Sequence, residues 1–149
     1  MGKYFEDFKI GERFNSPART LTEADIVTFA GLSGDYNPLH TDEEFAKKTP
    51  FKGRVAHGLL TLAISEGLRA RLALFEGTAI ALLGVNNVRF ISPVKAGDTI
   101  RVESRVASKR ETSKQERGII ILKDVVKNQR NEVVMEAEIT IMVRKKYYS

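Results

Sequence analysis

Residues 58–75 read GLLTLAISEGLRARLALF, and they predict one long helix because no proline or cluster of turn residues interrupts them. The first two turns are apolar on nearly every side, which is typical of an enclosed helix. Charged side chains enter only at Glu66, Arg69 and Arg71. We therefore expect the amino-terminal half of this helix to be buried and the carboxy-terminal half to reach the surface.

The hydrophobic pattern changes its period after Gly77. Residues 79–94, 98–111, 117–129 and 131–145 are rich in β-branched side chains, and three of these segments alternate apolar with polar residues as strands do. Turn residues separate the segments, which predicts antiparallel neighbours joined by hairpins or short loops. With an early strand at residues 13–20, the sequence predicts an α+β fold: an antiparallel sheet of about five strands around a long central helix.

A short stretch before this helix, residues 35–40 (DYNPLH), holds an acid and a base close together. The helix before it should start after the cap Thr22 and end near Gly31 or Gly34, and the helix after it should run from Thr41 or Asp42 to Lys48. Pro38 stiffens the connection, so Asp35 and His40 should be held in fixed directions. The alternative is an ordinary turn whose histidine caps a helix or faces solvent.

Composition limits the kinds of protein to consider. The 149 residues, 42% of them hydrophobic, fit one domain spanning residues 1–149. With no cysteine and two histidines, we expect no disulfide and no metal site. The charge of +5 is scattered apart from residues 144–146, and no nucleic-acid motif accompanies it. No apolar run could cross a bilayer and no export signal is visible, so we expect a soluble cytoplasmic protein that binds neither membranes nor nucleic acid.

Residues 29–60, FAGLSGDYNPLHTDEEFAKKTPFKGRVAHGLL, resemble the signature of the MaoC-like (R)-specific enoyl-CoA hydratases and dehydratases, which have the hot-dog fold. The family signature contains Gly-Asp-x-Asn-Pro-x-His followed by a His-Gly pair that opens the central helix, and this chain matches both parts. Residues 88–103, VRFISPVKAGDTIRVE, also resemble a strand region of that family. The resemblance covers essentially the whole chain.

The resemblance implies a lyase of fatty acid metabolism. Asp35 and His40 would hold one water against C3 of a trans-2-enoyl-CoA, giving a (3R)-hydroxyacyl-CoA, with coenzyme A as part of the substrate and no further cofactor. Either side chain could be the base, and we favour His40 because an unperturbed imidazole titrates nearer neutrality than a carboxyl group. Two other functions stay open: a thioesterase with the same fold, and a noncatalytic acyl-CoA-binding subunit.

The resemblance also assigns supporting residues. The amide of Gly58, at the start of the buried helix, would stabilise negative charge on the thioester oxygen. His57 would contact the ligand or order its own loop. Asn37 and Pro38 belong to the substrate-binding turn. Four cations flanking these loops would meet the phosphates of coenzyme A, although each also fits an ordinary surface charge: Lys52, Arg54, Arg89 and Lys95.

One position departs from the family pattern. Some members carry a serine shortly after the His-Gly pair, where this chain has Leu62 and Ala63, and the hydroxyl considered in its place is that of Ser65 on the same helix. The exposed edges of such a sheet are paired in hot-dog proteins, so the resemblance implies a homodimer or a higher homo-oligomer with the acyl site at the subunit boundary. Acyl chain length, and the choice between coenzyme A and acyl carrier protein as the carrier, stay open at this point.

Overall fold

The structure is a computed structural model that describes residues 1–146. No helix among these residues has the length and apolar character that crossing a membrane requires. The elements, in chain order, are η1 (Phe5–Asp7), β1 (Arg13–Asn15), β2 (Arg19–Thr20), α1 (Glu23–Ser33), α2 (Pro38–Thr41), α3 (Glu43–Ala46), α4 (Gly58–Ala70), β3 (Ala79–Phe90), β4 (Thr99–Glu111), β5 (Arg117–Lys127) and β6 (Val133–Arg144).

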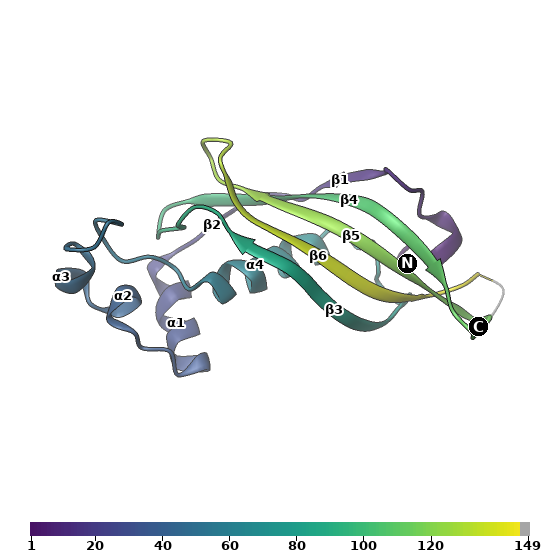
Figure 1. Ribbon diagram of the computed structural model, residues 1–149, viewed down its shortest axis with the longest axis horizontal. Helices are drawn as coiled ribbons and strands as arrows, with labels where there is room; N and C mark the ends of the chain where they lie inside the picture. The colour runs from purple at the N-terminus through teal and green to yellow at the C-terminus, as the bar shows by residue number, and fades with distance from the viewer. Residues whose placement is uncertain (147–149) are drawn as a thin grey trace.

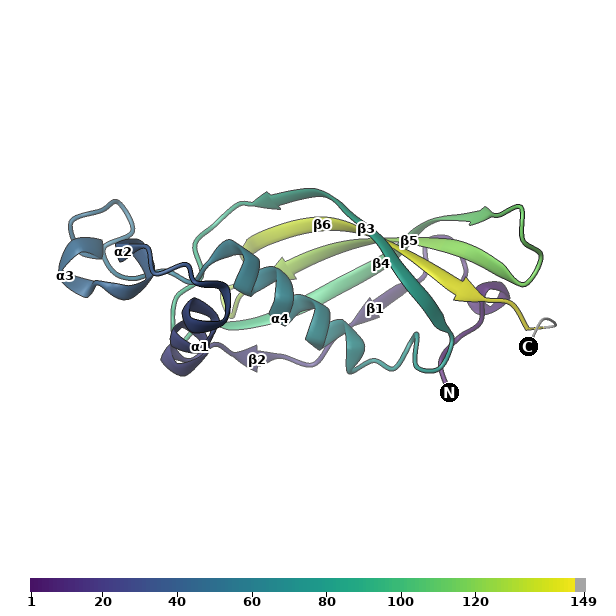
Figure 2. The ribbon, with the colours of Figure 1, turned by 90° about the horizontal axis from the view of Figure 1, so that it is seen from below.

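The strands form one curved antiparallel sheet with α4 lying across its inner face, which confirms the predicted α+β architecture (Figures 1 and 2). The sheet has six strands, in the order β1-β4-β5-β6-β3 with β2 also pairing with β4. The predicted early strand is split in two, because Pro17 has no N–H to donate to the ladder. Ser16 makes the last bond before the break, from its N–H to the carbonyl of Val102.

The position of β3 in the sheet differs from the prediction that consecutive strands are antiparallel neighbours. The hairpins between β4 and β5 and between β5 and β6 form as predicted. β3, however, pairs with β6 and not with β4, its successor in the chain. The free side of β4 is occupied by β1 and β2, so β3 forms the opposite edge of the sheet.

Burial along α4 follows the prediction for most residues and departs from it at one residue near each end. Leu60, Ile64 and Leu68 pack in the core as expected, but Leu59 is 63% exposed. Near the other end, Arg69 is only 2% exposed. Its guanidinium pairs with Asp124 inside the sheet and with Glu66 on the helix. A buried cation between two carboxylates is compensated, whereas the sequence pattern alone placed it at the surface.

The short helices α1, α2 and α3 gather at the amino-terminal end of α4, whereas the described chain ends lie toward its other end (Figure 2). Thr22 caps α1 as predicted, and Gly34 ends this helix with a positive φ of 78°. The segment expected as one helix from Thr41 or Asp42 consists of two, because Asn37 caps α2 and Asp42 both ends α2 and caps α3. These caps place residues 35–40 beside the start of α4.

Gly58 is the point where α4 meets the end of β3. A Cβ on Gly58 would lie 2.9 Å from Cζ of Phe90, closer than real Cβ atoms approach a neighbour. The ring of Phe90 therefore occupies the space that a side chain at position 58 would need. From the sequence we assign this glycine to the approach of a ligand, and the packing against Phe90 supplies a structural reason for it as well.

We expect Gly58→Ala to lower the free energy of unfolding by about 1–2 kcal/mol, because the ring must move to admit a methyl group. Gly67→Ala is the matched control on the same helix, since no atom lies within 4 Å of its added Cβ, and it should stabilise by about 0.5–1 kcal/mol. Adding Phe90→Leu to Gly58→Ala should recover part of the loss. Urea unfolding of these variants measures the differences, and equal stability of the two alanine variants would contradict the packing argument.

Candidate functional site

The Asp35 carboxylate is held by its own turn. Its Oδ1 accepts the N–H of Asn37 at 3.1 Å, and its main-chain N–H donates to the Ser33 hydroxyl at 3.1 Å. Asn37 in turn caps α2, accepting the N–H of Leu39 at 3.0 Å, and Pro38 is the first residue of that helix. Asn37 and Pro38 therefore build the turn in this structure. The other carboxylate oxygen, Oδ2, is left to face His40.

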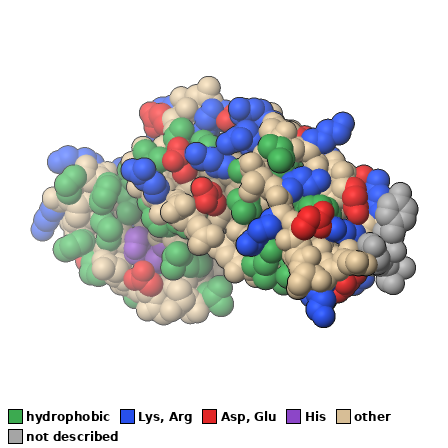
Figure 3. Space-filling view, turned by 45° about the vertical axis from the view of Figure 1, so that its right-hand side comes forward, with side chains coloured by type: hydrophobic (Ala, Val, Ile, Leu, Met, Phe, Trp, Pro, Cys, Tyr) green, Lys and Arg blue, Asp and Glu red, His purple; other side chains and the backbone are tan. Residues whose placement is uncertain are grey.

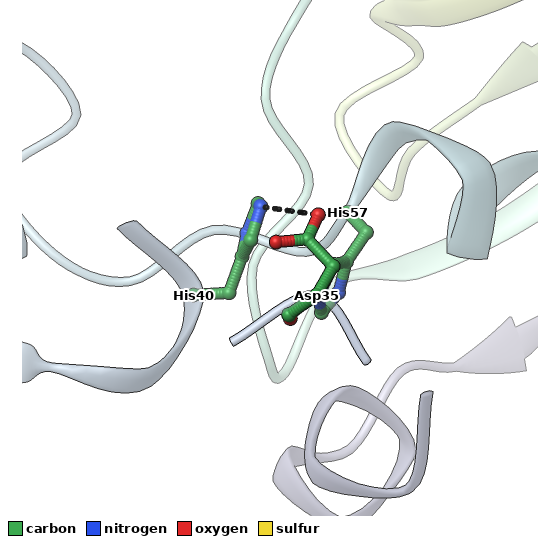
Figure 4. Close-up of side chains that lie close together, drawn as sticks. All are labelled: Asp35, His40 and His57. Carbon is green, nitrogen blue, oxygen red and sulfur yellow. Dashed lines mark hydrogen bonds and ion pairs between the residues drawn. The ribbon is translucent and has the colours of Figure 1, made fainter. Parts of the chain in front are cut away.

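His40 presents a defined nitrogen to that carboxylate. Its Nδ1 lies 2.7 Å from the carbonyl oxygen of Val55. A carbonyl only accepts, so Nδ1 carries the proton and donates it. In the neutral ring Nε2 then has a free lone pair, and it lies 3.9 Å from Oδ2 of Asp35 (Figure 4). This separation is too long for a direct hydrogen bond, and one water molecule could contact both atoms.

His57 lies behind the pair. It is 3% exposed, and its ring stacks on that of His40 with 3.8 Å between ring centroids. Its Nε2 is 2.9 Å from the main-chain carbonyl of Asp35, so Nε2 donates to that oxygen. Nδ1 of His57 is buried without a hydrogen-bond partner among the described residues. The ring thus touches both members of the predicted dyad.

A cavity of about 300 Å³ opens beside His40 and Gly58. Two exposed aromatic side chains are part of its lining, Phe90 at 52% and Phe51 at 37% exposure. In the space-filling view, histidine lies among hydrophobic side chains on this face (Figure 3). The remaining lining residues are Leu39, Val55, Ala56, Thr61, Ile91, Ser92, Pro93, Val94 and Val134.

Thr61 brings the hydroxyl that the sequence analysis sought elsewhere. Ser65, the residue considered there, is 1% exposed and donates to the carbonyl of Leu62 at 2.7 Å within its own helix. Thr61 instead lines the cavity together with Gly58. The spacing of three residues from Gly58 puts both on one face of a helix, and this spacing is the signal that could have identified Thr61.

The candidate phosphate-binding cations differ in their surroundings. Arg54 pairs with Glu23 and Glu43, each at 2.7 Å, so its charge is already balanced. Hydrogen bonds from Arg54 lower the pKa of both carboxyl groups below their ordinary values. Lys95 donates to the carbonyl of Phe51. Arg89, on the edge strand β3, is exposed and has no ion pair among the described residues.

The side chains of Asp35, His40 and His57 are also of the types that bind metal ions. Ligand atoms of Asp35, His40 and His57 lie within 4.8 Å of one another, a distance at which they could hold a cation. One nitrogen of each imidazole already donates to a carbonyl, which leaves one nitrogen per ring and the carboxylate. The expectation of a metal-free site remains a prediction. What the arrangement offers directly is two proton acceptors, His40 Nε2 and Asp35 Oδ2, beside a helix amino terminus.

The chain is similar in sequence to Protein MaoC and to an enoyl-CoA hydratase. The chain is 45% identical over 115 residues to Protein MaoC of Klebsiella aerogenes, covering 77% of this chain and 33% of that protein. It is 38% identical over 146 residues to the (R)-specific enoyl-CoA hydratase of Rhodospirillum rubrum, covering 94% and 91% of the two chains. The chain thus spans a third of the first relative and nearly all of the second.

Solved structures agree on the fold. A monoamine oxidase regulatory protein from Archaeoglobus superposes with a TM-score of 0.92 at 42% identity, covering 97% of this chain and 96% of that one. A Mycobacterium tuberculosis protein with a double hotdog fold superposes with a TM-score of 0.84 at 22% identity, covering 98% of this chain and 45% of that one, which identifies the hot-dog fold.

The MaoC-like domain family model matches residues 7–129. That range contains the Asp35 turn, the Val55 carbonyl and the start of α4, so the match includes the site as well as most of the sheet. Relatives named as hydratases and dehydratases indicate the general kind of enzyme. The chain belongs to the MaoC-like domain family, whose hydratase and dehydratase members it resembles along nearly its full length.

Proposed function

We propose that this protein adds water reversibly to a trans-2-enoyl-CoA to give a (3R)-hydroxyacyl-CoA. The observation that carries the proposal is the pair of acceptors, Nε2 of His40 and Oδ2 of Asp35, placed 3.9 Å apart beside the cavity at the start of α4. Relatives that carry the names of this hydratase and of 3-hydroxybutyryl-CoA dehydratase support the same chemistry.

Hydration requires one proton to leave water and one to reach the substrate. A water held between His40 and Asp35 gives its oxygen to C3 and one proton to the dyad, while C2 takes a proton from the dyad. Because Nδ1 of His40 is engaged by Val55, Nε2 is the ring atom that exchanges this proton. We favour His40 as the base, with Asp35 orienting the same water.

The thioester oxygen gains negative charge as the new bond forms. Gly58 is the first residue of α4, where N–H groups lack intrahelical acceptors and the helix dipole favours an anion. Its amide would donate to this oxygen. We also propose that Arg89 and Lys95, which adjoin the lining residues Phe90 and Val94 in the sequence, meet the phosphates of coenzyme A, and that no further cofactor takes part. The carboxylates that pair with Arg54 make this residue a brace between α1 and α3 in the structure.

The reaction is tested with crotonyl-CoA. Hydration removes the absorbance of the conjugated enoyl thioester without releasing thiol, because the thioester bond stays intact. We therefore expect loss of absorbance, no free thiol, and a product of 3R configuration on chiral analysis. Thiol release would identify a thioesterase. If a panel of enoyl thioesters of different chain lengths showed neither signal, the hydratase proposal would fail.

The dyad is tested by removing each acceptor. Asp35→Asn keeps the hydrogen bond from the Asn37 N–H but removes the charge, and His40→Ala removes Nε2. Each should lower kcat by about 100-fold or more, since general acid–base catalysis contributes factors of about 10²–10⁴. Tyr36→Phe is the matched control in the same turn, because Tyr36 is an exposed neighbour whose hydroxyl makes no hydrogen bond to a described residue. Near-normal rates in either dyad variant would contradict the assignment.

We also propose a homodimer joined along β3. This strand is at the edge of the sheet, and none of its residues is buried in the described chain. Ile80, Leu82 and Leu83 are 41–56% exposed, so apolar side chains emerge from both faces. An unpaired apolar edge of this length requires a cover, and a second β3 offers the same unpaired backbone groups.

Sedimentation velocity tests the dimer. Leu82→Lys combined with Leu83→Lys places charges on both faces of β3 and brings like charges together across the proposed interface, so we expect a shift from dimer to monomer at micromolar concentration. Ile10→Lys is the control, because Ile10 is also apolar and 66% exposed but precedes β1. An unchanged dimer in the double variant would place the interface elsewhere.

A further inference from the structure

The loop that carries Asp35 has one long-range hydrogen bond. Among the described residues, the N–H and hydroxyl contacts of residues 33–37 are made within the loop or to adjacent helical turns. The exception is the bond from Nε2 of His57 to the carbonyl of Asp35, which joins residues 22 positions apart. This bond connects the loop of the dyad carboxylate directly to the residue before Gly58.

The His57 side chain contacts other protein groups and does not line the cavity. It is the N-cap residue of α4, but its side chain makes no capping bond. The ring instead fills a buried space between His40, stacked at 3.8 Å, and Phe29, in edge contact at 5.0 Å. Gly58, the next residue, lines the cavity, whereas His57 does not.

We infer that His57 is a positioning residue: its Nε2–H holds the Asp35 main chain at a fixed distance from the Gly58 amide. The two groups must act on one substrate, the carboxylate at C3 and the amide at the thioester oxygen. Displacements of about 1 Å in such sites cost about 100-fold in rate. The inference rests on the proposed hydratase function for its kinetic consequence but not for its structural one.

Two substitutions separate the hydrogen bond from the ring. His57→Gln places an amide N–H near the position of Nε2 and lacks the aromatic face, whereas His57→Phe keeps the face and lacks the donor. We expect His57→Phe to lower kcat by about 10- to 100-fold with KM changed less than about 3-fold, and His57→Gln to stay within about 5-fold of wild type. The reverse order, or a rise in KM in both variants with kcat unchanged, would overturn the inference.

A double-mutant cycle distinguishes positioning from general stability. If His57 acts through the Asp35 carboxylate, His57→Phe should cost little further activity in the Asp35→Asn background. An equal, additive loss in both backgrounds would show that the ring acts independently of Asp35. Thermal unfolding of each variant, measured alongside, should not parallel the kcat values.

A spectroscopic measurement decides the structural claim even if His57→Phe fails to fold or no enoyl thioester is hydrated. In wild-type protein labelled with ¹⁵N-histidine, the proton of His57 must be on Nε2, because a carbonyl faces that atom. The inference is supported by an Nε2–H signal that disappears in His57→Gln while the His40 ring signals persist. A bare Nε2 on His57 would overturn it, whatever the kinetics show.

Discussion

The enclosed helix α4 brings its amino-terminal N–H groups to one end of the sheet, and the candidate site is arranged around that end. Leu60, Ile64 and Leu68 bury α4 against the sheet, and Arg69 anchors its far end to Asp124 inside that sheet. The amino-terminal N–H groups are then the backbone donors that no helical bond satisfies. Every feature of the candidate site, including the Asp35 turn and the ring of Phe90, lies around this end of the helix.

Two main-chain carbonyls determine what the two histidines can do. The Val55 carbonyl accepts a hydrogen bond from Nδ1 of His40, so the other nitrogen faces Asp35. The Asp35 carbonyl accepts a hydrogen bond from Nε2 of His57, so this N–H links two segments of the chain and does not face a ligand. Identical side chains thus receive different roles from the backbone around them, as expected where tautomers are fixed by neighbouring acceptors.

The sequence was sufficient for the architecture and for the motif but not for long-range contacts. Hydrophobic periodicity located the four long strands and α4, and the turn at residues 35–40 predicted that Asp35 and His40 lie close together, as they do at 3.9 Å. Local patterns could not show that β3 pairs with β6, that Asp124 compensates a buried Arg69, or that Glu23 and Glu43 balance Arg54. Each of these depends on residues distant in the chain, and periodicity carries no information about such partners.

The exposure of Asp35 connects the chemistry to assembly. Its side chain is 52% exposed, and the neighbouring Leu32 and Leu59 are 82% and 63% exposed. A carboxylate in open water acts weakly on its neighbours because the high dielectric constant screens it. Exclusion of water from this side would strengthen its effect on a shared water molecule and on His40. Leu32 and Leu59 are also costly to leave in water, so a group that covered them, such as the second subunit or the acyl chain proposed above, would remove apolar surface from water and exclude water from Asp35 together.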